Sequence, residues 1–303
     1  MTVATQAPTT TIEPCRDPAQ LRAYIDQYWR QGHILSRDQR MFDFQYRTPW
    51  VNQKIWPGGT SVLCIYESGG AGRLLGFLGS IVAPYPRPQS YWLALWHVLP
   101  ELKGGGAGGK LLQKMQEIAY AQDGWIGTFG AGPEALPVYL KRGYCCRAVR
   151  RWLYSPQDSA AAHAPHPHPP RHSAEVLPAD DWTHYRFTRH PIFTYEQRHG
   201  GIFRTEDNSW GTVTHAVRLH ETWPFDVRAV FERDSAHAKS RGLNHLMDTW
   251  AFDCPGPGWT LAPEDTPTVF HPPQARGNII YAVGRPFIPT MVSKGDCDQD
   301  RPN

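Results

Sequence analysis

The stretch LPELKGGGAGGKLL, residues 99–112, joins a run of glycines, broken only by Ala107, to a lysine and a leucine pair. Glycines this dense leave backbone N–H groups unshielded, and a helix that begins directly after them adds the positive end of its dipole. The stretch therefore predicts a loop that binds an anion such as a phosphate. The alternative is a solvent-exposed linker, but linkers are not usually bracketed by an apolar strand pattern and an amphipathic helix pattern.

One nucleotide-binding pattern in this loop fails at its last position. Gly104, Gly109 and Lys110 have the spacing of a Walker A loop, but Leu111 stands where a serine or threonine hydroxyl must bind magnesium. An apolar side chain cannot bind Mg²⁺, so the sequence disfavours a P-loop nucleoside triphosphatase.

A second pattern covers the same loop and the end of the strand before it. Residues 98–111 resemble motif A of the GNAT acyltransferase superfamily, V-x-P-E-x-R-G-x-G-x-G-x-x-L, with Lys103 in place of the usual arginine or glutamine. Residues 138–144, VYLKRGY, resemble the family's motif B, F-Y-x-x-x-G-F, at the expected distance downstream. The two matches together imply an α/β (α+β) GNAT-like fold with a mixed twisted sheet flanked by helices, and we expect two lobes.

Composition excludes several other classes of protein. The chain has 303 residues, 41% hydrophobic and 19% charged, which is typical of a globular protein of one large or two ordinary domains. A net charge of +3 with scattered basic residues gives no reason to expect nucleic acid as a partner. The sequence has no long apolar run and no leader pattern, so we expect no membrane partner and a cytoplasmic chain. It has no C-x-x-C pair, so we expect the cysteines to be reduced thiols.

Periodicity predicts the order of elements in the first half. We expect helices at 17–32, 36–47, 109–122 and 133–143, and strands at 60–66, 73–83, 90–98, 124–132 and 145–155. Asp17 is a candidate N-cap, and Gly143 a candidate C-terminal cap. This order is also the one that the GNAT resemblance implies.

The second half gives weaker signals. Residues 226–233 and 278–284 resemble strands and residues 236–250 a helix, without a second glycine loop. Residues 156–175, rich in proline, alanine and histidine, mark a linker. We therefore expect a GNAT-like acetyl-CoA-binding domain at 15–155 and a C-terminal lobe at 176–292. The end of this lobe resembles that of tandem GNAT-like proteins, which implies a degenerate GNAT-like second lobe. A metal site at the linker histidines is disfavoured because a proline-rich coil holds no fixed geometry, and no metal is expected.

The resemblance implies a site for acetyl-CoA, the co-substrate of the family. Backbone amides from Lys103 to Lys110 would bind the pyrophosphate, and the strand around Trp96 and Val98 would pair with the pantetheine amides. The residues of this expected site are Trp96, Val98, Lys103, Gly104, Gly105, Gly106, Ala107, Gly108, Gly109 and Lys110. Backbone N–H groups suit this task because they hold an anion without burying a side-chain charge.

The catalytic residues are less well defined by sequence. Tyr139 occupies the position of the family tyrosine that approaches the CoA sulfur, and its phenol could protonate the leaving thiolate. The position that often holds a glutamate base, six residues before Val98, is Trp92, which cannot take a proton. Three routes stay open: ordered water, His97, or an acceptor amine that arrives neutral.

The leading hypothesis is an N-acyltransferase that uses acetyl-CoA to acetylate the amine of a small molecule. The many aromatic residues would suit an amino sugar, a sugar nucleotide or a natural-product amine. The alternatives are a catalytically weak acyl-CoA-binding protein and a protein lysine acetyltransferase. The sequence does not identify the acceptor or the oligomeric state.

Overall fold

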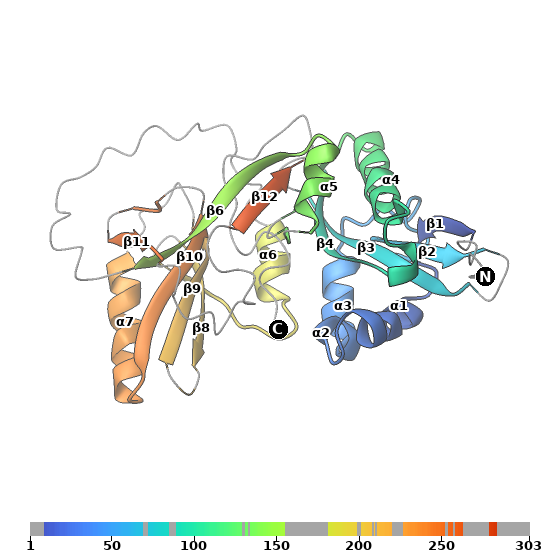
Figure 1. Ribbon diagram of the computed structural model, residues 1–303. Helices are drawn as coiled ribbons and strands as arrows, with labels where there is room; N and C mark the ends of the chain where they lie inside the picture. Colours follow the sequence, from blue (N-terminus) through green and yellow to red (C-terminus); the bar gives the residue numbers. More distant parts are fainter. Residues whose placement is uncertain are drawn as a thin grey trace, which may run out of the picture.

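The fold consists of two mixed sheets flanked by helices and joined through one long strand (Figure 1). This agrees with the α/β fold expected from the sequence. The computed structural model describes residues 9–68, 72–84, 89–128, 131–132, 134–154, 181–198, 201–207, 209, 211–219, 227–251, 254–256, 258–262 and 279–283. The predicted linker at 156–175 lies outside these residues.

The first sheet begins with five strands that lie side by side in chain order: β1 (Thr10–Pro14), β2 (Val62–Glu67), β3 (Leu74–Ala83), β4 (Ser90–Val98) and β5 (Trp125–Thr128). The β2–β3 hairpin and β4 match the predicted strands, whereas β1 was not predicted. Neighbours are antiparallel except β4 and β5, which are parallel and are connected by a helix.

Helices cover both faces of this sheet, and the main core lies between them and the strands. On one face lie α1 (Pro18–Tyr24), continued by a π-helical turn (Ile25–Trp29), α2 (Ile34–Arg37) and α3 (Gln39–Tyr46). On the other lie α4 (Ala107–Ala121) and α5 (Leu136–Lys141), while a 3-10 turn (Pro100–Leu102) precedes α4. Asp17 caps α1 as predicted, since its carboxylate accepts a hydrogen bond from the Ala19 amide at 2.8 Å.

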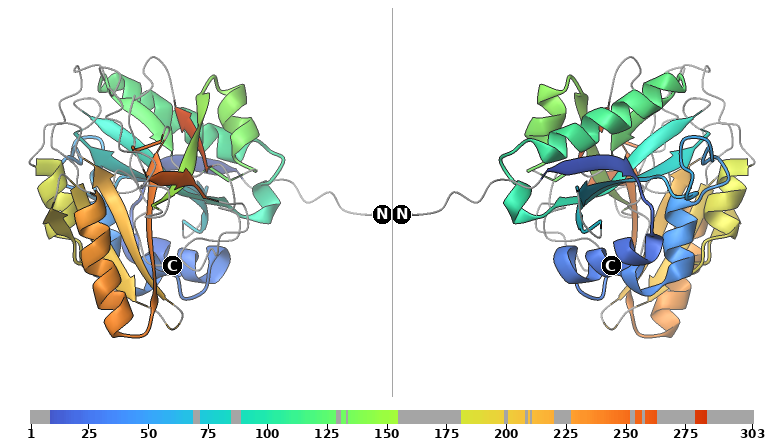
Figure 2. Two further views of the ribbon diagram at one scale, coloured as in Figure 1. Left: turned by 90° about the vertical axis from the view of Figure 1, so that its left-hand side faces the viewer. Right: turned by 90° about the vertical axis from the view of Figure 1, so that its right-hand side faces the viewer.

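The second sheet repeats the central unit of the first. It contains β7 (Glu196–Arg198), β8 (Gly201–Asp207), β9 (Gly211–Leu219), β10 (Asn244–Ala251) and β11 (Trp259–Leu261), with helices α6 (Asp181–Thr188) and α7 (Val227–Ser240). The hairpin β8–β9 is followed by α7 and by β10 parallel to β9, as β3–β4 is followed by α4 and β5. Each hairpin has a register shift near the end of its second strand. Figure 2 shows α7 on the outside of this sheet.

Two expectations for this half were wrong. Residues 226–233, expected as a strand, lie mostly in α7, and residues 236–250, expected as a helix, contain the end of α7 and most of β10. The inward face of α7 consists of Val230, Asp234 and Ala238, at helical spacing but with a carboxylate in the middle. This buried charge concealed the apolar period on which the prediction depended.

Strand β6 (Cys145–Tyr154) belongs to both sheets. Its first half pairs with β12 (Ile279–Val283), and its second half pairs with β10 on one edge and β11 on the other. Strand β12 in turn lies between β5 and β6. Residues 279–283 lie within the range expected for the C-terminal lobe, and their backbone hydrogen bonds complete the sheet of the first lobe.

Candidate active site

The parallel strands β4 and β5 are paired over only part of the length of β4. They pair from Ser90 to Leu93, and the last pair is Leu93 with Thr128. Beyond this point β4 continues to Val98, held by β3, and Leu95 has a positive φ of 45° where the β3–β4 register shifts. A bulge of this kind bends a strand and turns its following side chains. Strand β5 ends at Thr128 whereas β4 continues to Val98, and we call the point where their pairing ends the fork.

The glycine loop follows directly from this fork. Gly104 and Gly106 have φ values of +83° and +74°, a conformation that favours glycine, and α4 begins after Gly106. The amide of Lys110 bonds the Gly106 carbonyl at 3.0 Å and opens the helical ladder, so the earlier amides of the first turn point out of the helix end. A Cβ built on either glycine would meet no atom within 4 Å, so the space in front of the loop is open.

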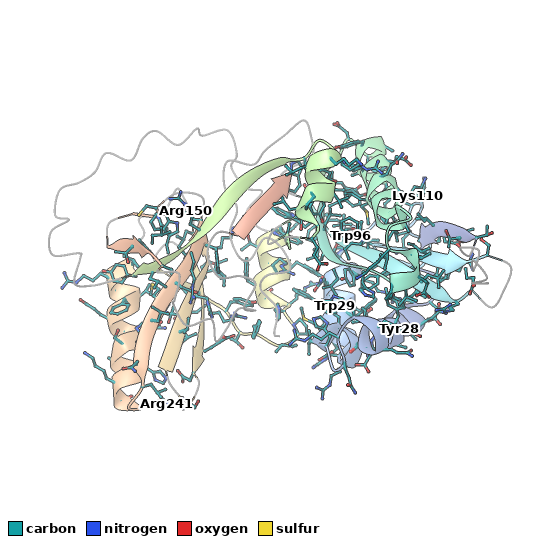
Figure 3. All side chains as sticks on the ribbon, viewed as in Figure 1. Tyr28, Trp29, Trp96, Lys110, Arg150 and Arg241 are labelled. Carbon is teal, nitrogen blue, oxygen red and sulfur yellow. The ribbon has the colours of Figure 1, made fainter. Side chains whose placement is uncertain are left out.

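The indole of Trp96 lies beneath the first turn of α4. A Cβ on Gly108 would approach Trp96 Cζ2 to 3.0 Å, so only glycine fits here without displacement. On its other side the indole contacts the ring of Tyr139, with 5.7 Å between the ring centroids. Figure 3 labels Trp96 on β4 and Lys110 on α4. Trp96 thus joins the loop to the predicted acid.

The position of Tyr139 is fixed by the end of α5 and by two aromatic neighbours, Trp96 and Tyr144. It lies on α5, which ends at Lys141, and Gly143 follows with a φ of +82° as the predicted terminating glycine: the Gly143 amide bonds the Leu140 carbonyl, and the Tyr144 amide bonds the Tyr139 carbonyl. The Tyr139 side chain is only 3% exposed and packs on Tyr144, 5.1 Å away between centroids, as well as on Trp96. Its ring position is therefore fixed by packing.

His97 lies on the opposite face of β4 from Trp96, because successive strand residues alternate. Its partner on β3 is Phe77, and the partner of Trp92 is Ile81, four residues away on the same face. The bulge therefore places His97 on the same face as Trp92, but beyond the fork. Trp92 is buried and packs on Trp125 at 4.8 Å between centroids.

The environment of His97 favours the neutral imidazole. Burial lowers the pKa of His97 below its usual value, and the nearby charge of Lys103 lowers this pKa further. The Nδ1 atom lies 2.9 Å from the hydroxyl of Tyr24 on α1. A neutral imidazole offers a lone pair at physiological pH, which a general base needs.

The structure brings the expected cofactor residues from Trp96 to Lys110 together with Tyr139, but it places Tyr139 and His97 on opposite faces of the sheet. Two further residues contact this group and were not identified from sequence. Arg142 bonds the Gly109 carbonyl, and Tyr24 contacts His97. Arg142 lies inside motif B, so its charge could have marked it as a candidate site residue. Tyr24 is far from His97 in sequence, so no sequence pattern could have indicated this contact.

A separate pocket of about 480 Å³ lies in the second lobe between the β7–β8 hairpin and α7. Its charged side chains pair with one another: Arg198 with Asp234 at 2.8 Å and Arg233 with Glu196 at 2.7 Å. This pocket contains no residue of the expected site. We place the candidate active site in the first lobe, where the open loop and the fork meet.

Among the described residues, no group of three or more histidine, cysteine or acidic side chains could hold a metal ion. The linker histidines lie outside those residues. Cys15 and Cys64 are buried free thiols, and Cys254 is an exposed one.

Within the described part of the chain, no helix has the length and apolar character needed to cross a membrane.

Residues 24–144 match the acetyltransferase (GNAT) family, and this range includes α4, α5, the glycine loop and the fork. The chain contains a GNAT acetyltransferase domain. The GNAT domain is of the acyltransferase class, which agrees with the enzyme class expected from the two motifs. No curated protein sequence matches the chain.

Solved structures with a similar fold are also GNAT proteins. A GCN5-related N-acetyltransferase from Anabaena variabilis is 14% identical with a TM-score of 0.51, covering 91% of this chain and 72% of that one. One from Sphaerobacter thermophilus is 13% identical with a TM-score of 0.43, covering 92% and 97%. Naa50 of Arabidopsis thaliana, in complex with the bisubstrate analogue CoA-Ac-MVNAL, is 14% identical with a TM-score of 0.35, covering 46% and 85%. At these identities the likeness concerns the fold alone.

Proposed function

We propose that the protein transfers an acetyl group from acetyl-CoA to the amine of a small molecule. One observation carries this proposal: an open glycine loop at a helix N-terminus lies beside the fork of β4 and β5, with Tyr139 packed next to it. Amides and a helix dipole directed at open space are suited to a pyrophosphate. The fork leaves backbone groups of β4 for the amides of the pantetheine arm.

Each predicted cofactor residue then has a role. Within the expected range from Lys103 to Lys110, the amides of Lys103, Gly105 and Lys110 already donate to backbone carbonyls at 3.0, 3.3 and 3.0 Å, so the remaining amides bind the pyrophosphate. The exposed side chains of Lys103 and Lys110 add positive charge at its rim. The backbone at Trp96 and Val98 pairs with the pantetheine. Acetyl-CoA supplies an activated acyl group as co-substrate.

In the proposed reaction, Tyr139 on one face of the sheet gives a proton, and His97 on the other face accepts one. The acceptor nitrogen forms a bond to the thioester carbonyl carbon, the C–S bond breaks, and the sulfur leaves as a thiolate. Tyr139 donates its phenolic proton to that sulfur, while Nε2 of His97 takes the proton that the nitrogen loses. The phenolate and the imidazolium then exchange protons with solvent, so charge and atoms balance over a turnover.

The second lobe supports a small acceptor rather than an extended peptide. It repeats the hairpin, helix and strand of the GNAT domain, and the connection at 220–226, HETWPFD, has no glycine. We propose that it is a degenerate lobe that helps enclose the acceptor. We also propose that the two lobes have the expected bounds of 15–155 and 176–292, except that β12 belongs to the sheet of the first lobe. An amino sugar, a sugar nucleotide or a natural-product amine fits the aromatic composition.

The test is incubation with acetyl-CoA and an amine library, with release of free thiol as the readout. Melting curves with CoA and with Mg-ATP accompany it, because Leu111 cannot bind magnesium and only CoA should protect the fold. Protection by CoA without thiol release from any amine would favour an acyl-CoA-binding protein. Release with lysine peptides alone would favour a protein acetyltransferase, and protection by Mg-ATP alone would overturn the assignment.

A further inference from the structure

Tyr24 lies at the end of α1, where the helix widens into the π-helical turn Ile25–Trp29. The side chain is 3% exposed and its ring packs edge-on against Phe77, 5.7 Å away between centroids. Its hydroxyl oxygen lies 2.9 Å from His97 Nδ1 and 3.2 Å from the Leu75 carbonyl oxygen. Widened helical turns of this type are frequent at functional sites. Figure 3 labels Tyr28 and Trp29 on this segment.

The two contacts of the Tyr24 hydroxyl determine the direction of both hydrogen bonds. The Leu75 carbonyl can only accept, so the hydroxyl proton must point toward it. The Leu75 carbonyl also accepts from the Leu99 amide at 2.9 Å, so it has a donor in either case. If the Tyr24 hydroxyl instead donated to His97, its oxygen lone pairs would face the Leu75 oxygen at 3.2 Å, and this contact would be repulsive. The arrangement that satisfies both contacts has His97 Nδ1–H donating to the Tyr24 oxygen, at the usual N–H···O distance.

The charges around the pair keep both rings in the forms that this arrangement needs. Burial raises the pKa of Tyr24 well above its usual value, so the phenol stays protonated. Burial and Lys103 lower the pKa of His97, so the imidazole is neutral at pH 7. The other groups that affect the Tyr24 phenol are Glu101, Cys64, Tyr28 and Arg73, of which Arg73 and Glu101 form an ion pair at 2.6 Å.

We propose that Tyr24 is a positioning residue that holds His97 as the Nδ1–H tautomer, leaving the Nε2 lone pair free to accept the proton of the acceptor amine. The proposal rests on the proposed function. When the new C–N bond forms, the nitrogen's proton moves to Nε2 and gives an imidazolium whose Nδ1–H still donates to Tyr24. The opposite tautomer would carry a proton on Nε2 and could not act as a base.

The direct test is nitrogen NMR of protein labelled with ¹⁵N-histidine, which distinguishes the two tautomers without any turnover. His97→Gln identifies the signals of His97 by their loss. We expect Nδ1 protonated and Nε2 unprotonated at pH 7.5 in the parent protein. Tyr24→Phe removes only the hydroxyl, and we expect it to shift His97 toward the Nε2–H form that is favoured in water. A parent protein with His97 protonated on Nε2 would overturn the proposal.

Kinetics supplies the second readout. With an acetylated amine in hand, Tyr24→Phe should lower kcat by about tenfold, a part of the 10²-fold to 10⁴-fold of general base catalysis, with KM for acetyl-CoA unchanged. The acidic limb of the kcat profile should move to lower pH, because the imidazolium loses a hydrogen-bond acceptor. Tyr154→Phe, which removes one hydroxyl from a buried tyrosine in the core of the second lobe, is the control and should change neither.

The two proposals fail in different ways. If no amine is acetylated but His97 is the Nδ1–H tautomer and responds to Tyr24→Phe, the proposed function fails and the positioning role stands. If the parent protein is active but Tyr24→Phe keeps the full rate and the same pH profile, the positioning role is wrong and the proposed function stands. Melting curves of Tyr24→Phe ensure that both comparisons are made on folded protein.

Discussion

The guanidinium of Arg142 donates through Nη2 to the backbone carbonyl of Gly109 at 3.1 Å, and through Nη1 to the side chain of Gln113 at 2.9 Å. Arg142 directly follows α5, which carries Tyr139, whereas Gly109 and Gln113 lie in the first half of α4. One side chain therefore joins the helix of the proposed acid to the helix that begins at the glycine loop.

Arg142→Met should reduce catalysis more than stability. It keeps most of the aliphatic stem but removes both hydrogen bonds, and because the group is exposed the free energy of unfolding should fall by about 1 kcal/mol or less. We expect kcat/KM to fall by about tenfold, since a misplaced acid costs more than a lost surface contact. Lys141→Met, at the exposed neighbouring position, is the control. Equal losses of kcat/KM in the two variants would contradict a role for the Arg142 contact.

Gly106→Val should weaken CoA binding without unfolding the protein. The residue has φ +74°, so a side chain costs about 1–2 kcal/mol of strain, but its Cβ meets no protein atom and would project into the space proposed for the pyrophosphate. Gly242→Val is a matched control, because Gly242 has φ +70° and equally open surroundings at the end of α7. Calorimetry should show CoA affinity lost by a few kcal/mol in the first variant only. Unchanged affinity in a folded Gly106→Val protein would exclude this loop as the anion site.

Tyr139→Phe tests the acid. The ring should keep its packing on Trp96 and Tyr144, so CoA should bind as in the parent protein. Turnover should fall by about 10²-fold to 10⁴-fold if the phenol protonates the leaving thiolate. The measurement is thiol release under single-turnover conditions, with CoA affinity determined in parallel. A full rate in the variant would mean that the thiolate takes its proton from another group.

Removal of β12 should destabilise the GNAT domain although the strand is far from it in sequence. A chain ending at residue 262 lacks the strand that pairs with both β5 and β6, and it leaves two unpaired strand edges in the first sheet. We expect Tm to fall by about 10 °C or more, from a loss of several kcal/mol, relative to a chain ending at residue 283. Equal Tm values for the two chains would show that the first lobe folds without β12.

The first lobe could be predicted from sequence because its signals are local. The positive φ at Gly104 and Gly106, the Asp17 cap and the end of α5 at Gly143 each follow from one residue type at one place. The second lobe was misassigned where charge is buried. Asp234 on α7 pairs with Arg198 at 2.8 Å, and Asp248 on β10 pairs with Arg151 at 2.9 Å. Such pairs fill core positions with residues that periodicity counts as polar.

Contacts between distant segments were also beyond prediction. The bulge at Leu95 decides which face His97 occupies, and no residue type at that position indicates it. The family resemblance places the usual glutamate base at the position of Trp92. The β3–β4 register shows that His97 lies on the same face of β4 as Trp92. The packing of α1 on the sheet brings the Tyr24 hydroxyl to His97 Nδ1.

The place of β12 has a consequence for synthesis on the ribosome. Strands β5 and β6 are made before residues 155–278, whereas the strand that lies between them is made after those residues. At ordinary elongation rates, translation of residues 155–278 takes on the order of ten seconds. Throughout that interval the nascent acetyltransferase lobe exposes the edges of β5 and β6 to other chains, because this sheet can close only after residues 279–283 have been made.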